Sequence, residues 1–287
     1  MTDKAWQAET LHDDFQTAFL ATDVLYDTAT EHQRLVLFEN PTYGRVLMLD
    51  GATQLTTADE FVYHEMMAHT PILAHGVAKD ILIVGGGDGG VAREVLRHST
   101  VERLVQVEID DSVVAFSRQY LPEISAGAFD DPRHELVIAD GARFMAETER
   151  RFDVIIVDST DPIGPAQVLF TEAFYADCRR ALKEDGILIT QSGVPFIQGE
   201  ELEAGARDLR ASFADVWCYL CTVPTYVGGE MALGWASDQP AHRRVPLEVL
   251  EVRYEAAGLV GKTRYYAPDL HQAAFVLPPY IKRLVIG

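Results

Sequence analysis

Two short stretches of the sequence carry acidic residues that could hold a small cationic ligand. The glycine loop Gly85–Gly90 contains Asp88, and the string Asp158-Ser159-Thr160-Asp161 carries two carboxylates three residues apart. A carboxylate beside a reacting amine attracts its charge and can accept its proton. The alternative is a capping role for Asp158 or Asp161, because such strings often begin turns.

The glycine loop fits two nucleotide-binding patterns. Gly85, Gly87 and Gly90 match the dinucleotide fingerprint G-x-G-x-x-G, whereas Gly85, Gly87 and Gly89 match the G-x-G-x-G of adenosylmethionine-dependent methyltransferases. A dinucleotide would place its pyrophosphate beside Asp88, and two unit charges about 4 Å apart repel by roughly 4 kcal/mol. Asp88 therefore argues against a phosphate-bearing cofactor and favours a ligand with a positive group near the loop.

Carboxylates also follow two other apolar runs. Glu108 ends the run 104–107, and Asp140-Gly141 follows the run 136–138. A carboxylate can accept two hydrogen bonds at once, so Glu108 suits a pair of ribose hydroxyls, and Asp140 suits an adenine amine. A solvated acid is the alternative for each residue taken singly, but their common position favours a ligand site.

The elements that must position these acids appear from residue 80 onward. Apolar runs alternate with helical stretches, which predicts a doubly wound, mostly parallel α/β sheet. The predicted strands are 81–84, 104–107, 136–138, 154–157 and 186–190, and helices follow from about 91 and 112. Ligands of such sheets bind at the carboxyl ends of the strands. That edge carries Asp88, Glu108, Asp140 and Asp158.

Residues 1–57 predict a small antiparallel β module that precedes a catalytic domain of residues 58–287. Short strands are expected at 35–38 and 46–49, with a turn at Asp50-Gly51 after them. Thr57 and Glu60 then form a capping-box pattern for a helix that we expect to end near Pro71.

Composition restricts the possible partners. The 287 residues include 24 basic and 44 acidic ones, which gives a formal charge of −20. Such a surface repels nucleic acid and anionic membranes, so neither partner is expected. No apolar run is long enough for a transmembrane helix, and the N-terminus has no apolar signal core, so we expect a cytoplasmic protein.

Two further patterns carry less weight. Cys218-x-x-Cys221 lies in a strand-like run and, with Cys178, indicates buried thiols of a reducing compartment. His64 and His69 resemble the zinc motif H-E-x-x-H, but their five-residue spacing places them about 140° apart on a helix. We therefore expect no metal site and no tightly bound cofactor.

The sequence resembles the spermidine synthase family of polyamine aminopropyltransferases, whose fold is that of the adenosylmethionine-dependent methyltransferases. Motifs that carry the resemblance are spread over nearly the whole chain. They include Asp50-Gly51-x-x-Gln54, Tyr63-His64-Glu65-Met66, the glycine loop, Asp158-x-x-Asp161-Pro162-x-Gly164-Pro165, Pro224-Thr225-Tyr226 and Ala273-Ala274-Phe275-x-Leu277-Pro278. Leu233 stands where the family often carries an aromatic residue.

The resemblance implies that the protein transfers the 3-aminopropyl group of decarboxylated S-adenosylmethionine, its co-substrate, to a diamine such as putrescine. The products would be spermidine and 5′-methylthioadenosine. Asp158 would accept the proton, and Asp88 would hold the ammonium of the aminopropyl group. The residues that would place the amine are Tyr63, His64, Asp161 and Tyr226. The residues that would hold the adenosyl part are Gln33, Gln54, Gly85, Glu108, Asp140, Gly141 and Pro165.

Several points stay open at the level of sequence. The acceptor could be putrescine, cadaverine, agmatine or spermidine, and the resemblance implies a homodimer or a homotetramer. The Pro- and Gly-rich loop 158–170 is an expected lid. The competing hypotheses are an amine N-methyltransferase that uses intact S-adenosylmethionine and a polyamine-binding protein without turnover. Asp88 and the pair Asp158 and Asp161 argue against the methyltransferase. A binding protein without turnover would lack the base, and Asp158 is present.

Overall fold

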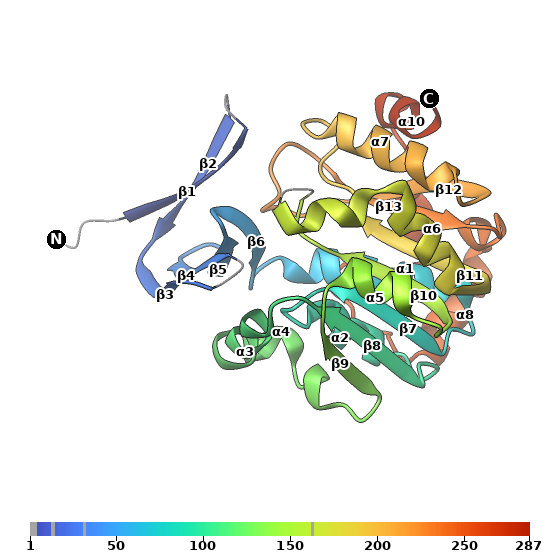
Figure 1. The fold of residues 1–287 in the computed structure, drawn as a ribbon, viewed down its shortest axis with the longest axis horizontal. Coiled ribbons are helices and arrows are strands. Elements are labelled where there is room, and N and C mark those ends of the chain that lie inside the picture. The colour runs from blue at the N-terminus through green and yellow to red at the C-terminus, as the bar shows by residue number, and fades with distance from the viewer. Residues whose placement is uncertain (1–4, 13–14, 31–32, 162–163) are drawn as a thin grey trace. The chain divides into compact units, whose positions relative to one another are not determined.

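The chain folds into two compact units in a computed structural model that describes residues 5–12, 15–30, 33–161 and 164–287 (Figure 1). One unit comprises Met1–Phe61 together with Val223–Val227. The other comprises Val62–Thr222 and Gly228–Gly287. The boundary that the sequence predicts after residue 57 stays a prediction.

The first unit is built from antiparallel strands, which confirms the predicted β module. Strands β1 (Ala5–His12) and β2 (Phe15–Ala21) pair with each other. A four-stranded sheet contains β3 (Asp23–Ala29), β4 (Arg34–Asn40), β5 (Gly44–Leu49) and β6 (Ala52–Thr56). The apolar core of this unit contains side chains from β2 and from the four-stranded sheet: Phe19, Ala21, Val36, Phe38, Val46 and Met48. Strands β1 and β3 contain no buried residue among those whose burial is described, and their apolar residues do not alternate regularly with polar ones, so the sequence gives no strand signal there.

The segment Val223–Val227 joins this unit through hydrogen bonds to residues far away in the sequence. The Thr225 amide donates to Asp59 Oδ2 over 2.8 Å, and the Thr225 hydroxyl donates to the same oxygen. The Tyr226 hydroxyl donates to the carbonyl of Gln54 over 2.5 Å. A stretch with no strand or helix of its own is thereby held in place.

Helix α1 (Glu60–His75) extends beyond its predicted end and contains Pro71. A proline removes one backbone hydrogen bond and crowds the preceding turn, so a helix break was the expected outcome. Buried side chains on both sides, Met67 and Ile72 among them, hold the helix through this position. The Thr57 hydroxyl accepts a hydrogen bond from the Arg45 amide in the sheet, so the capping-box interpretation of Thr57 is wrong.

The second unit has a seven-stranded sheet in the order β12-β13-β11-β10-β7-β8-β9. Its strands are β7 (Asp80–Gly85), β8 (Arg103–Glu108), β9 (His134–Ile138), β10 (Phe152–Asp158), β11 (Leu182–Gln191), β12 (Asp215–Cys221) and β13 (Met231–Ser237). Strands β7 to β11 are parallel, and β13 runs antiparallel to both of its neighbours. This confirms the doubly wound, mostly parallel sheet. The run Met231–Ser237 contains glycine and alanine in place of β-branched residues and thus carries no strong strand signal.

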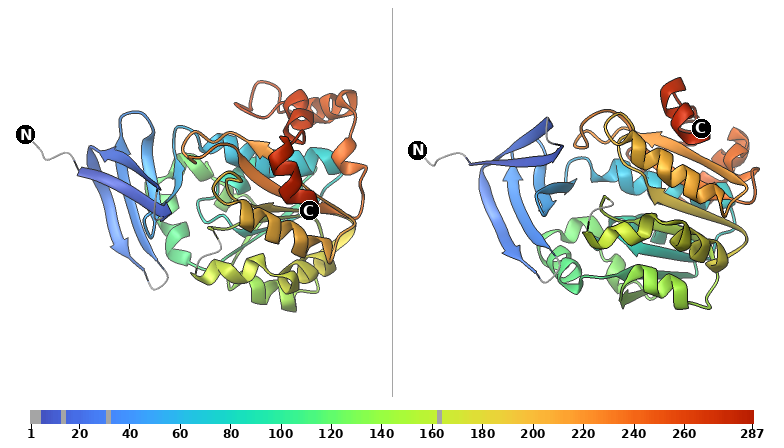
Figure 2. Two further views of the ribbon diagram at one scale, coloured as in Figure 1. Left: turned by 90° about the horizontal axis from the view of Figure 1, so that it is seen from above. Right: turned by 45° about the horizontal axis from the view of Figure 1, so that its top comes forward.

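Helices cover both faces of this sheet (Figure 2). On one face lie α5 (Gly141–Glu147), α6 (Glu172–Ala181) and α7 (Gly199–Arg210), with α10 (Pro279–Ile286) against α7 and β12. The other helices are α2 (Gly90–Leu96), α3 (Asp111–Tyr120), α4 (Pro122–Ser125), α8 (Leu247–Ala256) and α9 (Pro268–Ala274). No helix of the described residues is long and apolar enough to span a membrane.

The strand order reverses between β7 and β10. The chain leaves β7 toward β8 and β9 on one side, and it later returns to build β10 and β11 on the other. Connections that diverge in this way leave a crevice at the carboxyl ends of the two central strands. The glycine loop follows β7 and Asp158 ends β10, so both lie at this crevice.

Candidate active site

The glycine loop begins directly against the end of strand β10. Gly85 is the register partner of Asp158 in the parallel ladder, and the Gly86 amide donates to the Asp158 carbonyl oxygen over 2.9 Å. The strand residues behind them, 81–84 and 154–157, are at most 1 % exposed. Rigid, buried strands therefore fix the two chain segments that carry the predicted catalytic acids.

The Asp158 side chain is half-buried, and one of its two carboxylate oxygens has a hydrogen-bond partner among the described residues. Its Oδ1 accepts a hydrogen bond of 2.8 Å from the Tyr63 hydroxyl, whereas its buried Oδ2 has no partner among the described residues. Burial raises the pKa of Asp158 to about 7, and the charge of Asp88 adds to the effect against smaller opposing contributions from His64 and Tyr63. A carboxyl that titrates near neutral pH suits a group that accepts a proton during turnover.

Asp88 lies on the other side of the same crevice and is ionised more easily. Its Oδ1 accepts from the Gly90 amide over 2.6 Å and lies 3.5 Å from His64 Nε2. Burial alone would raise the pKa of Asp88, but His64, the Gly90 amide and Arg93 together hold it below its ordinary value. A Cβ atom on Gly90 would lie 2.2 Å from the His64 ring, so glycine at this position makes room for the imidazole.

Glu108 ends β8 beside the glycine loop. Its side chain is buried, its Oε1 accepts from the Asp110 amide over 3.0 Å, and its Oε2 lies against Gly87. Burial raises the pKa of Glu108, and the neighbouring charges of Asp110 and Asp88 act in the same direction. The structure thus brings Tyr63, His64, Gly85, Asp88, Glu108 and Asp158 together at one edge of the sheet.

Asp140 and Gly141 begin helix α5 at the same edge. The exposed Asp140 accepts a hydrogen bond of 2.9 Å from the Arg143 amide, so it caps the helix. A Cβ atom on Gly141 would lie 2.5 Å from Val84 Cγ1 of strand β7. Asp140 is thus an exposed acid that caps a helix, and its adenine-binding role stays a prediction.

Asp161 is held by two glutamine amides that the sequence analysis did not single out. Its Oδ1 accepts from Gln191 Nε2 over 2.8 Å, and its Oδ2 accepts from Gln198 Nε2 over 3.0 Å. Gln198 Oε1 in turn accepts from the Val194 amide over 2.8 Å. Asp161 also lines a small cavity with Gln191, Gln198, Thr190 and Trp217. A lone glutamine at the end of a strand or at the start of a helix gives little signal in a sequence.

The rest of the expected lid is only partly described. Residues 162–163 lie outside the described residues, and Gly164–Phe170 form a 3₁₀ helix rather than an irregular loop. Pro165 belongs to this helix. Lid motion and the adenosyl-binding role of Pro165 stay predictions.

Three of the predicted binding residues belong to the first unit. The Gln33 amide donates to Thr30 Oγ1 over 3.1 Å, and Gln54 Nε2 donates to the Ala52 carbonyl over 3.2 Å. Tyr226 contacts Gln54 as described above. The contributions of Gln33, Gln54 and Tyr226 to a ligand site stay predictions.

Comparison with known proteins identifies the family. A model described as the spermine/spermidine synthase domain matches residues 60–245, and one described as the spermidine synthase tetramerisation domain matches residues 5–57. The chain belongs to the spermine/spermidine synthase family. It is therefore an enzyme of the aminopropyltransferase class, as the sequence resemblance predicts.

Relatives of this family match over almost their full length. A polyamine aminopropyltransferase of Ruegeria sp. (strain TM1040) is 58% identical over 284 residues, which cover 99% of each chain. A crystal structure of spermidine synthase in complex with the transition state analogue AdoDATO has a TM-score of 0.90 and 38% identity, and covers 98% of this chain and 94% of that one. Spermidine synthase from Thermotoga maritima has a TM-score of 0.87 and 36% identity over 98% and 94% of the two chains.

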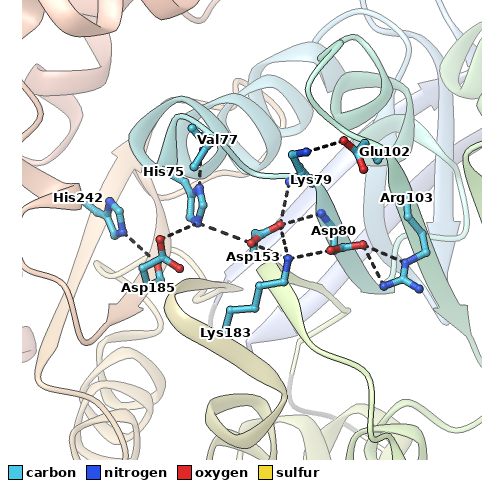
Figure 3. Close-up of polar contacts among 10 residues, drawn as sticks. All are labelled: His75, Val77, Lys79, Asp80, Glu102, Arg103, Asp153, Lys183, Asp185 and His242. Carbon is cyan, nitrogen blue, oxygen red and sulfur yellow. Dashed lines mark hydrogen bonds and ion pairs between the residues drawn. The ribbon is translucent and has the colours of Figure 1, made fainter.

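A second cluster of ionisable residues lies at the opposite, amino-terminal edge of the sheet of this family member (Figure 3). Among the described residues, one group of three histidine, cysteine or acidic side chains has potential metal-ligand atoms that all lie within 4.8 Å of one another. It consists of His75, Asp153 and Asp185. Lys183 Nζ, however, lies 2.9 Å from Asp153 Oδ1, where a metal ion would have to replace it. The Val77 amide donates to His75 Nδ1 over 3.4 Å, which places the proton of the neutral ring on Nε2. The chemistry of these donors fits an ion-pair network better than a metal site.

The two histidines of the H-E-x-x-H-like motif have separate surroundings. His64 faces Asp88, whereas the buried His69 has its Nδ1 2.9 Å from His98 Nε2 and its Nε2 3.1 Å from Glu94 Oε2. The interpretation that they do not share a metal is consistent with these different partners.

Proposed function

We propose that the protein transfers the 3-aminopropyl group of decarboxylated S-adenosylmethionine to the diamine putrescine, giving spermidine and 5′-methylthioadenosine. The observation that carries the proposal is the convergence of Asp88, Glu108 and Asp158 at the crevice between β7 and β10. None of these three carboxylates has an ion pair with a lysine or arginine among the described residues. A cleft of this kind attracts a sulfonium, an ammonium and a diamine, and it disfavours a phosphate.

The donor is distinguished from intact S-adenosylmethionine by its missing carboxylate. A carboxylate near Asp88 would be repelled, whereas the terminal ammonium of an aminopropyl group is attracted. Glu108 would accept hydrogen bonds from both ribose hydroxyls, and Asp140 would accept from the adenine amine. Gln33, Gln54, Gly85, Gly141 and Pro165 would complete the adenosyl site.

In the reaction, the amine nitrogen attacks the propyl carbon next to the sulfonium. The new C–N bond forms as the C–S bond breaks, and the sulfur keeps the electron pair of the C–S bond and leaves as methylthioadenosine. The amine attacks as the free base, because an ammonium nitrogen has no lone pair, and Asp158 accepts the proton that this nitrogen gives up. Tyr63, His64, Asp161 and Tyr226 would orient the acceptor, and Tyr63 already donates to Asp158.

The raised pKa of Asp158 eases this proton transfer. An alkylammonium has a pKa near 10.4 and an ordinary aspartate one near 3.9, so transfer between unperturbed groups costs roughly 9 kcal/mol. With the pKa of Asp158 at about 7, the separation between the two groups falls to roughly half. This separation is that of the protein without ligands. The sulfonium of a bound donor lowers the pKa of the amine, which reduces the cost, and also lowers the pKa of Asp158, which opposes this gain.

The direct test incubates the purified protein with decarboxylated S-adenosylmethionine and a panel of amines: putrescine, cadaverine, agmatine and spermidine. Mass spectrometry of the amine and chromatography of released methylthioadenosine are the two readouts. We expect putrescine to have the highest kcat/KM. A higher kcat/KM for another amine would correct the acceptor while leaving the transfer reaction intact.

The same assay separates the competing function of an amine N-methyltransferase. Intact S-adenosylmethionine would then methylate the amine and release S-adenosylhomocysteine. We expect no methylated product, because the ionised Asp88 disfavours the carboxylate of the intact donor. Methylation without aminopropyl transfer would overturn the proposal.

We also propose a homotetramer, with residues 1–57 as the oligomerisation module and 58–287 as the catalytic domain. The match of residues 5–57 to a tetramerisation domain supports an oligomer. Trp6 and Phe15 of the β1–β2 hairpin are 64% and 42% exposed, which leaves apolar surface for a second copy. Light scattering after size-exclusion chromatography distinguishes a tetramer from the alternative homodimer and from a monomer.

A further inference from the structure

Gln106 is a polar residue in the middle of an otherwise apolar buried strand. It lies in β8 between Val105 and Val107, and its side chain is completely buried. In the parallel ladder it is the register partner of Ile83, two positions before the glycine loop. A buried amide is unfavourable unless its polar atoms find hydrogen-bond partners.

The amide nitrogen of Gln106 donates to two carbonyls of the glycine loop. Nε2 lies 2.9 Å from the Gly85 carbonyl oxygen and 2.6 Å from that of Gly86. The ladder between β7 and β8 has its last register pair at Val84 and Val107, so both carbonyls lie beyond it. The side chain therefore continues the strand-to-strand hydrogen bonding into the loop.

The loop at this point is able to adopt other conformations. Gly85 and Gly86 have φ values of 89° and 68°, and glycine reaches both signs of φ at little cost. Rotation of a peptide plane would redirect a carbonyl without moving the strand. Two donors on one buried side chain select a single orientation for both carbonyls.

The selected conformation also sets the surroundings of the Asp158 carboxylate. A Cβ atom on Gly86 would lie 2.8 Å from Asp158 Oδ2 and 3.5 Å from Gln106 Nε2, so Gly86 lies between the two side chains. The same loop continues to Asp88. The distance between the two acids of the crevice therefore depends on where Gly86 is held.

We propose that Gln106 is a positioning residue, which holds the Gly85 and Gly86 carbonyls and thereby sets the glycine loop against Asp158. The inference rests on the proposed aminopropyl transfer, since it names the group that arranges that site. Gln106 Oε1 is buried and has no hydrogen-bond partner among the described residues. An apolar side chain would avoid this unpaired oxygen, so the advantage of a glutamine here lies in the two hydrogen bonds that its amide nitrogen donates to the loop.

The principal variant is Gln106→Met, which keeps the shape of the side chain and removes both donors. We expect kcat to fall about 10- to 100-fold, because small displacements of catalytic groups have effects of this size. The matched control is Val105→Ala on the same strand, which creates a cavity and leaves the loop donors in place. At a temperature where both variants are folded, the control should have a kcat close to that of the wild type.

The conservative variant Gln106→Glu gives a readout that a purely structural role would not change. A protonated glutamic acid can donate one hydrogen bond to a loop carbonyl, whereas its carboxylate cannot. We expect its kcat, divided by that of the wild type, to fall as the pH rises. This isosteric variant also carries the test if the methionine variant does not fold.

Amide hydrogen exchange of residues 86–90 tests the positioning independently of turnover. Faster exchange in Gln106→Met but not in Val105→Ala supports the proposal. Equal exchange in both variants, a wild-type kcat in Gln106→Met, or an equal loss of kcat in the control would overturn it. Absence of methylthioadenosine release by the wild-type protein would instead contradict the proposed function, and the exchange experiment would still decide the role of Gln106.

Discussion

Strand β10 has an aspartate at each end, and the two side chains are in opposite electrostatic settings. At the amino-terminal edge, Asp153 Oδ2 accepts hydrogen bonds of 2.8 Å from the Lys79 and Asp80 amides, and Lys183 pairs with the same carboxylate (Figure 3). These partners outweigh burial and lower the pKa of Asp153. At the other end, the Asp158 carboxylate has one hydrogen-bond donor in the part of the chain that the structure describes, Tyr63, and burial raises its pKa to about 7.

The difference shows how one sheet separates stability from reactivity. A carboxyl whose folded-state pKa is lowered stabilises the fold above its unfolded-state pKa, and this contribution is lost as the pH falls through the folded-state value. A carboxyl whose folded-state pKa is raised lowers the stability of the fold, and this loss grows as the pH rises from the unfolded-state pKa to the folded-state pKa. Asp153 is thus a stabilising group, whereas Asp158 lowers stability and is available to a cationic ligand.

The strongest test of this comparison is Asp158→Asn. We expect kcat to fall by about 10²- to 10⁴-fold, because the proton acceptor is removed. Urea unfolding at pH 8 should give a stability at least equal to that of the wild type, since a buried and poorly paired charge is gone. A kcat within tenfold of the wild type, about 1.4 kcal/mol in barrier height, would contradict the assigned role.

The second test concerns the donor. Asp88→Ala should weaken binding of decarboxylated S-adenosylmethionine about 10- to 100-fold, because a hydrogen bond to a charged group contributes about 1.5–3 kcal/mol. Methylthioadenosine lacks the aminopropyl ammonium, so its Kd should change far less. Calorimetry with the two ligands measures both values, and equal losses would show that Asp88 does not recognise the ammonium.

The third test addresses the other end of β10. Asp153→Ala leaves two backbone amides without their acceptor and removes one of the two carboxylate partners of Lys183, which keeps Asp80. The unfolding free energy should therefore fall by about 1–3 kcal/mol. Steady-state kinetics at a temperature where the variant is folded should give a wild-type kcat. A loss of kcat as large as that of Asp158→Asn would remove the separation between the two edges.

The fourth test uses pH. Because Asp158 must be deprotonated to accept a proton, kcat/KM for the donor should fall about tenfold per pH unit below about pH 7. Bound donor brings positive charge, which lowers the pKa of Asp158, so the acid limb of kcat should lie at lower pH. Rate profiles for both parameters between pH 5 and about 9 decide the point. Coincident acid limbs would show that the donor does not change the ionisation of Asp158.

The smallest effect is expected within the amino-terminal edge itself. The pair formed by Lys79 and Glu102 has a 2.7 Å separation, but both side chains are more than half exposed. Solvent and salt screen such pairs, so Glu102→Gln should leave Tm and kcat unchanged within error. A clear fall in Tm would show that this edge acts as one cooperative network that includes its exposed pairs.

Much of the site could be predicted from the sequence because it follows strand ends. Glu108 and Asp158 come directly after an apolar run, and Asp88 lies in the glycine loop that follows another. Parallel topology carries such positions to one edge of the sheet. Gln106, Gln191 and Gln198 were not predicted, because an uncharged amide within a strand or at a helix start resembles many structural residues. The extension of α1 through Pro71 was missed for a similar reason, since it depends on packing that is not local.

By itself, the sequence determined the alternation of strands and helices, the acid inside the glycine loop and the resemblance to the aminopropyltransferases. These features depend on local patterns: hydrophobic period, glycine spacing and residue type. Only the tertiary structure decided how Asp153 and Asp158, five positions apart in one strand, differ in ionisation. Their pKa values depend on burial and on partners such as Lys183 and Tyr63, which are brought close only when distant segments pack together.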